Sequence, residues 1–152
     1  MIVNLDKIGR IAANLRKLGE DIDGVVDTAL GDGAQSITDS AKSFVEIQGA
    51  VDTGELVGNI VAVHNDKCQW VVSSRAPHSI FIEYGTGNMG DPSVAHTTRY
   101  RWVYYNKKLN DFRTAYPQPA RPFMRPAFAE NKNKVVLKVS RAIVAAALKR
   151  GK

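Results

Sequence analysis

Cysteine is nearly absent from the sequence, because Cys68 is the only one among 152 residues. A single cysteine excludes an internal disulfide framework and any metal site built from several cysteines, and it fits a reducing compartment. Long apolar runs are also missing, since none approaches the ~20 residues that a membrane-spanning helix needs. Residues 1–20 carry charges every few positions and contain no apolar core of a secretory signal. The sequence therefore predicts synthesis in the cytoplasm and no membrane partner.

Acidic residues are scarce outside the first quarter of the chain. Residues 1–40 hold four basic and seven acidic residues, whereas the remainder holds 17 basic and eight acidic ones, which gives the overall charge of +6. Such segregation is compatible with nucleic-acid contact, with an acidic face of one copy docking on a basic face of the next, or with a solvated basic surface. Charge alone does not choose among these three interpretations.

Hydrophobic periodicity predicts helices at both ends of the chain. Apolar residues recur at three- and four-residue intervals from Ile2 to Ala29, as one face of a helix requires. Gly31, Asp32 and Gly33 predict a turn, after which a second helical segment continues to about residue 48. A last helix is expected after Pro126, with cations near its C-terminal end.

The middle of the chain changes to the pattern of strands. Residues 59–63, 69–73 and 79–84 are short, rich in Val, Ile and aromatics, and predict sequentially paired antiparallel strands. Tyr100, Trp102 and Tyr104 alternate and suggest a further strand, with residues 107–114 as a polar hairpin tip. Together these patterns predict an α+β fold in one domain over residues 1–152. Its parts are a helical N-terminal part at 1–48, a small mostly antiparallel sheet at 49–118 with an insertion at 86–116, and a proline-rich lead-in and helix at 119–152.

Three local patterns resemble catalytic or cofactor motifs and are better explained otherwise. Asp52, Thr53 and Gly54 match the short aspartic-protease signature, but the flanking residues are polar, so a turn is the better interpretation. Residues 85–90 match GxGxxG, yet Asp-Pro follows where a dinucleotide site needs a helix, so a mobile loop is expected. His64, His78 and His96 lack metal-ligand spacing, and no base is marked beside Cys68. No catalytic residue, cofactor or metal is predicted.

Residues 99–108 interleave basic and aromatic side chains. Such a segment can bind phosphates and stack on bases, which supports a basic nucleic-acid-binding module. Trp, Tyr and Arg are equally the residues favoured at protein–protein contacts. We prefer the protein interface and keep nucleic-acid binding as the alternative.

Residues 119–127, with the sequence PARPFMRPA, form a stiff segment. Each proline fixes its own φ and pushes the residue before it toward extended geometry. Phe123 and Met124 offer an apolar anchor, and Pro126 suits the first turn of a helix. The segment predicts a rigid lead-in to the terminal helix.

Three segments in order carry a resemblance. They are VDTGEL at 51–56, FIEYGT at 81–86 and PARPFMRPA at 119–127, which Gln118 extends. Their order and spacing resemble the gene-product-ten-like tail-component family of long-tailed double-stranded DNA bacteriophages over residues 50–150. The stretch from residue 88 to 116 departs from that family by being longer and more aromatic, so its role is not transferred.

The resemblance implies a non-enzymatic virion protein of the neck or tail-completion region. Such a protein forms a ring, typically hexameric, between the head connector or stopper and the tail terminator or tail tube, with DNA passing through its lumen. The residues expected to serve structure or interfaces are Asp52, Thr53, Gly54, Glu83, Tyr84, Gly85, Trp102, Arg121, Pro122, Phe123, Arg125 and Pro126.

Overall fold

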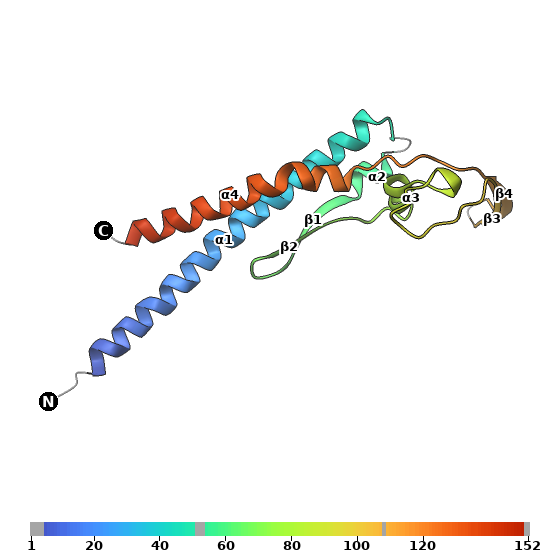
Figure 1. Cartoon of the computed structure of the whole chain (residues 1–152). Coiled ribbons are helices and arrows are strands. Elements are labelled where there is room, and N and C mark those ends of the chain that lie inside the picture. The colour runs from blue at the N-terminus through green and yellow to red at the C-terminus, as the bar shows by residue number, and fades with distance from the viewer. Residues whose placement is uncertain (1–4, 51–53, 108, 151–152) are drawn as a thin grey trace.

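Two long helices dominate the fold. The computed structural model describes residues 5–50, 54–107 and 109–150. Helix α1 spans Leu5–Ile47 and helix α4 spans Met124–Arg150. They run antiparallel, because Asn131 bonds Ser40 while Lys138, further along α4, bonds the earlier residue Asp32. Figure 1 shows the two helices crossing, with β1 and β2 (residues 60–74) running back alongside α1 and with β3 and β4 (residues 102–115) at the far end of the molecule. Within the described residues, neither helix has an apolar segment long enough to cross a bilayer.

Helix α1 is continuous, so the predicted turn at Gly31–Gly33 is wrong. Both glycines lie where another element approaches the helix closely. A Cβ on Gly31 would lie 2.8 Å from the indole of Trp70, and one on Gly33 would lie 2.7 Å from both γ-carbons of Val135. The glycines thus give space to the first hairpin and to α4, and this packing overrides their low helix propensity.

This packing predicts opposite effects for two helical glycines. Gly33→Ala should lower the free energy of unfolding by about 1 kcal/mol, because overpacking against Val135 outweighs the gain in helix propensity. Gly24→Ala should raise it by roughly 0.5–1 kcal/mol, since nothing lies within 4 Å of its added Cβ. Urea unfolding of both variants measures the difference. Equal stabilisation by both alanines would contradict the close approach of α4.

The buried core lies where the end of α1 meets the start of α4. Its apolar members come from α1, from the short helix α2 (Glu55–Gly58), from strand β1 (Ile60–Asp66), from residue 76 in the loop that precedes residues 79–84, and from the segment that begins α4. They are Ile37, Ala41, Val45, Leu56, Ile60, Ala76, Phe123 and Ala127. Helix α4 therefore packs on α1 at this junction, and the core joins residues from both ends of the sequence.

The first predicted hairpin is confirmed. Strand β1 pairs antiparallel with β2 (Gln69–Ser74), with Ile60 opposite Ser74 and His64 opposite Trp70. Asp27 of α1 accepts hydrogen bonds from the Cys68 N–H at 3.0 Å and from Trp70 Nε1 at 3.2 Å, and its Oδ1 lies 3.0 Å from His64 Nε2. One carboxylate thus fixes the tip of the hairpin to the long helix.

Residues 79–84 form helix α3 (Ser79–Tyr84), so the predicted third strand is wrong. A short apolar run does not by itself distinguish a strand from a helical turn. Here the N–H groups of Phe81 and Ile82 bond back to the His78 carbonyl, and the helical turn directs Glu83 into the interior. The 3₁₀ turn η1 (Gly87–Met89) follows within the predicted loop.

The strand predicted from the aromatic alternation is confirmed as β3 (Trp102–Asn106). The tip predicted at 107–114 is too long, because β4 (Asp111–Ala115) already pairs with β3 from Asp111 onward. The α+β class is confirmed, with the described strands arranged as two separate two-stranded antiparallel sheets.

Candidate functional site

Glu83, at the end of α3, lies at the N-terminus of α4 and is only 5% exposed. Its carboxylate accepts the backbone N–H groups of Phe123 at 2.7 Å, Met124 at 2.9 Å and Arg125 at 3.1 Å. The first four N–H groups of a helix have no partner inside it. Three of them bond Glu83, and the fourth position is Pro126, which has no N–H. Every donor at this helix end is thereby accounted for.

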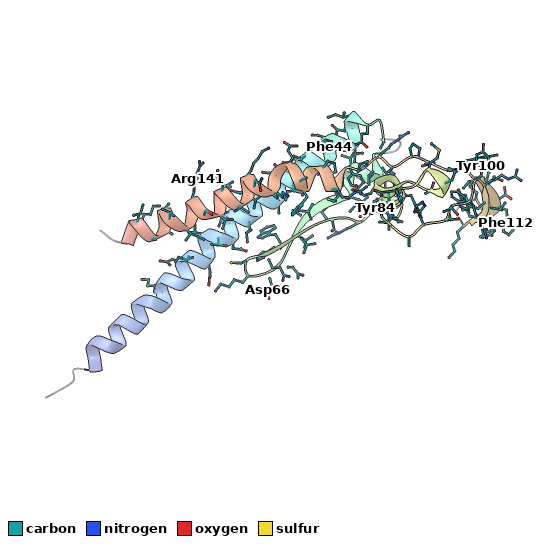
Figure 2. All side chains as sticks on the ribbon, viewed as in Figure 1. Phe44, Asp66, Tyr84, Tyr100, Phe112 and Arg141 are labelled. Atoms are coloured by element: carbon teal, nitrogen blue, oxygen red, sulfur yellow. The ribbon has the colours of Figure 1, made fainter. Side chains whose placement is uncertain are left out.

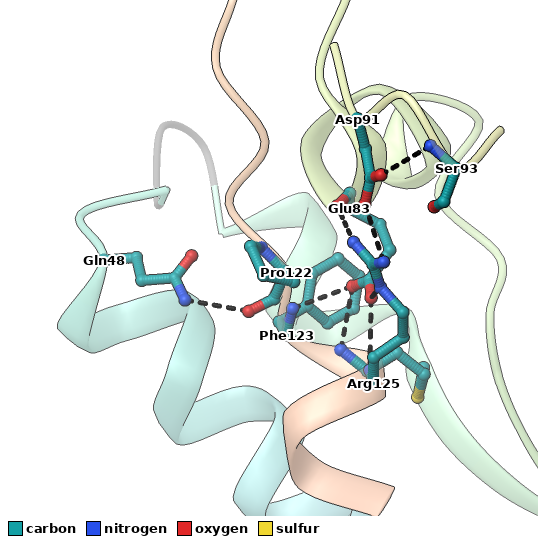
Figure 3. Close-up of polar contacts among 8 residues, drawn as sticks. Gln48, Glu83, Asp91, Ser93, Pro122, Phe123 and Arg125 are labelled. Atoms are coloured by element: carbon teal, nitrogen blue, oxygen red, sulfur yellow. Dashed lines mark hydrogen bonds and ion pairs between the residues drawn. The ribbon is translucent and has the colours of Figure 1, made fainter. Parts of the chain in front are cut away.

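Arg125 extends the contact into a network of charges (Figure 3). Its Nε donates to Glu83 Oε1 at 3.0 Å, Nη1 donates to Asp91 at 2.7 Å, and Nη2 donates to the Glu83 carbonyl at 3.2 Å. The guanidinium also lies 4.6 Å from the ring centre of Tyr84. A negative charge at a helix N-terminus is favourable, and hydrogen bonds between charged groups are stronger than neutral ones. The network therefore fixes α3, the following loop and α4 relative to one another.

Asp91 is the more exposed of the two carboxylates in this network, although its side chain is only 18% exposed. Hydrogen bonds from the Ser93 hydroxyl and N–H, followed by the bond from Arg125, lower the pKa of Asp91 to about 2. Asp91 and Glu83 in turn hold the pKa of Arg125 above its ordinary value. Both groups are therefore charged throughout the physiological pH range.

The low pKa of Asp91 predicts a loss of stability in acid. A carboxyl group whose pKa is depressed by folding stabilises the native state above its ordinary pKa of 3.8, and this contribution disappears as the pH falls towards about 2. The difference in free energy of unfolding between wild type and Asp91→Asn should be largest at pH 5 and shrink towards pH 2. Urea unfolding across this range measures it. Asp111→Asn, in the exposed hairpin, is the control, and an equal pH response in both variants would contradict the network.

Gly85 lets the chain after α3 pass directly against the proline-rich segment. Its φ is +70°, and a Cβ there would lie 2.6 Å from the Ala120 nitrogen and the Gln118 oxygen, so both backbone and space require glycine. Thr86 pairs with Gln118 in an antiparallel bridge, and the Arg121 N–H donates to the Ile82 carbonyl at 2.8 Å. Gln48, directly after α1, donates through its side-chain amide to the Pro122 carbonyl at 2.8 Å.

A groove lies beside this junction, between α2, α3 and the second hairpin. Its lining includes Phe81, Trp102, Tyr104 and Arg121, together with the backbone around Pro117. Trp102 is half-buried and Arg121 is exposed. The groove is lined by apolar and aromatic surface with one cation, Arg121, and one anion, Glu55, which suits contact with another chain rather than the binding of a metal.

The structure brings together most of the residues predicted from the motifs. Those that meet at the junction of α3 and α4 are Glu83, Tyr84, Gly85, Arg121, Pro122, Phe123, Arg125 and Pro126. Trp102 lies apart on β3, and Gly54 precedes α2 with a φ of +77°. Asp52 and Thr53 lie outside the described residues. Sequence reasoning missed Asp91 and Gln48, whose roles depend on contacts across 34 and 74 positions of the chain.

The residues considered for catalysis serve the fold where they are described. His64 and Cys68 bind Asp27. Partial burial alone would raise the pKa of Asp27, but its hydrogen bonds with His64, Cys68 and Trp70 lower the pKa below its ordinary value. His96 Nδ1 lies 2.7 Å from the Val94 carbonyl in its own loop. Among the residues described, no group of His, Cys, Asp and Glu has an arrangement that could hold a metal ion.

Comparison with protein-family profiles gives a match over the N-terminal half of the chain. A profile of the family described as "Bacteriophage HK97-gp10, putative tail-component" matches residues 9–85, about half of the chain. This match contains most of α1, the first hairpin and residues 81–85 of the motif that carries Glu83. It ends before residues 119–127, whereas the resemblance was expected over residues 50–150. No curated protein and no solved structure matches the chain. The chain therefore belongs to the HK97-gp10-like family of bacteriophage tail components.

Proposed function

We propose that the chain is a structural protein of the phage neck, a tail-completion component that forms a ring between the head connector and the tail tube. The protein is made in the host cytoplasm and becomes part of the virion. Its partners are further copies of itself, typically six in the ring, the head connector or stopper, and the tail terminator or tail tube. The family membership supports a tail component, and the three ordered motifs support the neck.

The observation that carries this proposal is the large apolar surface that one copy exposes. The outer side of α4 presents Val136, Leu137, Val144 and Leu148, which are between 49% and 68% exposed. The second hairpin exposes further aromatic side chains at the far end of the molecule, as Figure 2 shows for Phe112. Exposed apolar side chains in such number suit protein–protein contacts. A component of a multi-subunit assembly covers such surfaces with its neighbours.

The junction around Glu83 supports a structural role rather than an enzymatic one. Its carboxylate is saturated by three backbone N–H groups and Arg125, so it has no capacity left for acid–base chemistry on a substrate. Its effect is to hold the stiff proline segment in one position. A preorganised segment loses little conformational entropy when it docks on a neighbour.

Two measurements test the proposal. Native mass spectrometry of the purified full chain should give a closed oligomer of defined copy number, and mass spectrometry of purified virions should detect the chain in neck-containing fractions. A strictly monomeric protein that is absent from virions would refute it.

The alternative function is a basic nucleic-acid-binding module, which the exposed Tyr100, Tyr104, Arg99 and Arg101 favour. Binding through phosphate contacts releases counterions and must weaken steeply as the salt concentration rises. Titration of double-stranded DNA at low and high salt tests it, and absence of binding at low salt would dismiss it. The two functions are compatible in a neck ring, since DNA passes through the lumen.

A further inference from the structure

The second hairpin has one face that is turned away from the rest of its own chain. Side chains alternate along a strand, and Tyr105 lies opposite Phe112 in the pair, so Val103, Tyr105 and Phe112 share one side, with Arg101 directly before the strand and Lys107 directly after it. We call these five residues the outer hairpin face. All five are exposed, and the rings of Tyr105 and Phe112 pack edge to face with centres 5.2 Å apart.

The other face of the hairpin carries Trp102 and Tyr104, which line the groove beside α3. The outer hairpin face is therefore available to a partner. It has three apolar side chains at its centre and a cation at each end, Arg101 and Lys107. An apolar centre with a polar rim is the usual composition of a protein–protein interface, and aromatic side chains dominate its binding energy. A two-stranded hairpin standing alone is also marginal in water, so a partner would stabilise it.

A complementary surface lies on α1. Exposed polar residues recur there at seven-, four-, three- and four-residue intervals and so lie along one side of the helix. They form what we call the acidic stripe, which consists of Asp21, Thr28, Asp32, Gln35 and Asp39. Residues 20–39 contain six acidic and no basic residues, whereas residues 99–116 contain five basic and one acidic. The two segments therefore attract each other.

The two surfaces are too far apart to meet within one chain. Figure 1 places β3 and β4 at the end of the molecule away from the N-terminal part of α1, on the far side of the core. A contact between them must join two copies. Because it uses different surfaces on the two partners, it is head-to-tail, and such contacts give rings when the rotation closes.

We propose that the outer hairpin face of one copy docks on the acidic stripe of the next copy. This inference rests on the proposed ring and names the contact that builds it. Tyr105 and Phe112 supply buried aromatic area, and Arg101 and Lys107 pair with Asp21 or Asp39 to set the register. The partner is another copy rather than nucleic acid, because the face is apolar at its centre and the same chain carries the acidic counterpart.

Charge reversal on each surface tests the contact. Variant A carries Arg101→Glu and Lys107→Glu, and variant B carries Asp21→Lys and Asp39→Lys. All four positions are exposed, so both variants should keep the wild-type circular dichroism spectrum. Each alone should need roughly tenfold more protein to assemble in sedimentation velocity, because every contact brings like charges together. An equimolar mixture should assemble again, since each hairpin of one variant then matches the stripe of the other in an alternating ring.

The matched control reverses two exposed cations outside the second hairpin and α1, Arg75→Glu and Lys132→Glu, and changes the net charge by the same amount as variant A. It should assemble like wild type. Wild-type assembly that variants A and B both retain would overturn the hairpin contact and leave the ring intact. A wild type that stays monomeric would overturn the ring and the contact together. Loss of DNA binding in variant A with unchanged assembly would assign the face to nucleic acid and also overturn the contact.

Discussion

Replacing Glu83 with alanine should destabilise the protein by about 3–4 kcal/mol, because the buried groups that bond its carboxylate are left without an acceptor. The carboxylate accepts the N–H groups of Phe123, Met124 and Arg125 as well as the guanidinium of Arg125. Losing a helix cap alone costs about 1 kcal/mol. The larger loss follows from burial, since the Phe123 N–H lies in the interior and water cannot replace the carboxylate there without opening the junction.

The partial solvation of Arg125 limits this loss. Its side chain is 43% exposed and retains Asp91 as a partner, so its charge is not left wholly unpaired when Glu83 is removed. Glu83→Gln should therefore cost about half as much as the alanine variant, because the amide oxygen still accepts from the backbone while its NH₂ group opposes Arg125. Urea unfolding of both variants gives the values.

Glu130→Ala is the matched control for Glu83. Glu130 also belongs to an ion pair at α4, with Lys134 at 3.0 Å, but both side chains are more than half exposed. Exposed pairs of this kind contribute only about 0.3–0.5 kcal/mol. A Glu83→Ala variant that is no less stable than Glu130→Ala would show that the α4 N-terminus does not depend on the buried carboxylate.

The long helices and the first hairpin could be predicted because their signals are local. Residues 59–63 and 69–73 are short runs rich in Val, Ile and aromatics with a polar break between them, and the apolar spacing of α1 persists over many turns. The turn predicted at Gly31 and Gly33 was wrong for a non-local reason. Each glycine makes space for a side chain far along the sequence, Trp70 in one case and Val135 in the other. The residues that flank each glycine therefore do not predict the close contact.

The sequence predicted most of the residues of the candidate site but not the contacts between them. The sequence singled out Glu83, Arg125 and Pro126 from two motifs, and the structure shows that these motifs meet at one helix end. The prediction of a strand at 79–84 hid this contact, since a strand end would not bring the Glu83 carboxylate to the Phe123 N–H. From the sequence, Asp91 indicated only a turn before proline. Its role in the network depends on the hydrogen bond from Arg125, which lies 34 positions further along the chain.

Replacing Phe123 with alanine should cost about 3–5 kcal/mol, the range for removing a buried aromatic side chain and leaving a cavity. Phe123 is 2% exposed and packs in the core with residues of α1, α2 and β1. Phe128→Ala, about one turn later in α4 and 57% exposed there, should change stability by no more than roughly 0.5 kcal/mol. Urea unfolding of the two variants separates burial from residue type. Similar losses in both would contradict the core position of Phe123.

Phe123 and Glu83 should also be coupled, because the carboxylate bonds the backbone of the residue whose ring fills the core. Once the Phe123 ring is removed, the first turn of α4 is held less firmly. The Glu83 carboxylate then bonds a more mobile backbone and stabilises it less. The double variant Phe123→Ala/Glu83→Ala should therefore lose less than the two single losses combined, by about 1 kcal/mol or more. Strict additivity would mean that the core and the helix cap act independently. Coupling would show that the proline segment joins them into one rigid unit, which docking on a neighbouring subunit requires.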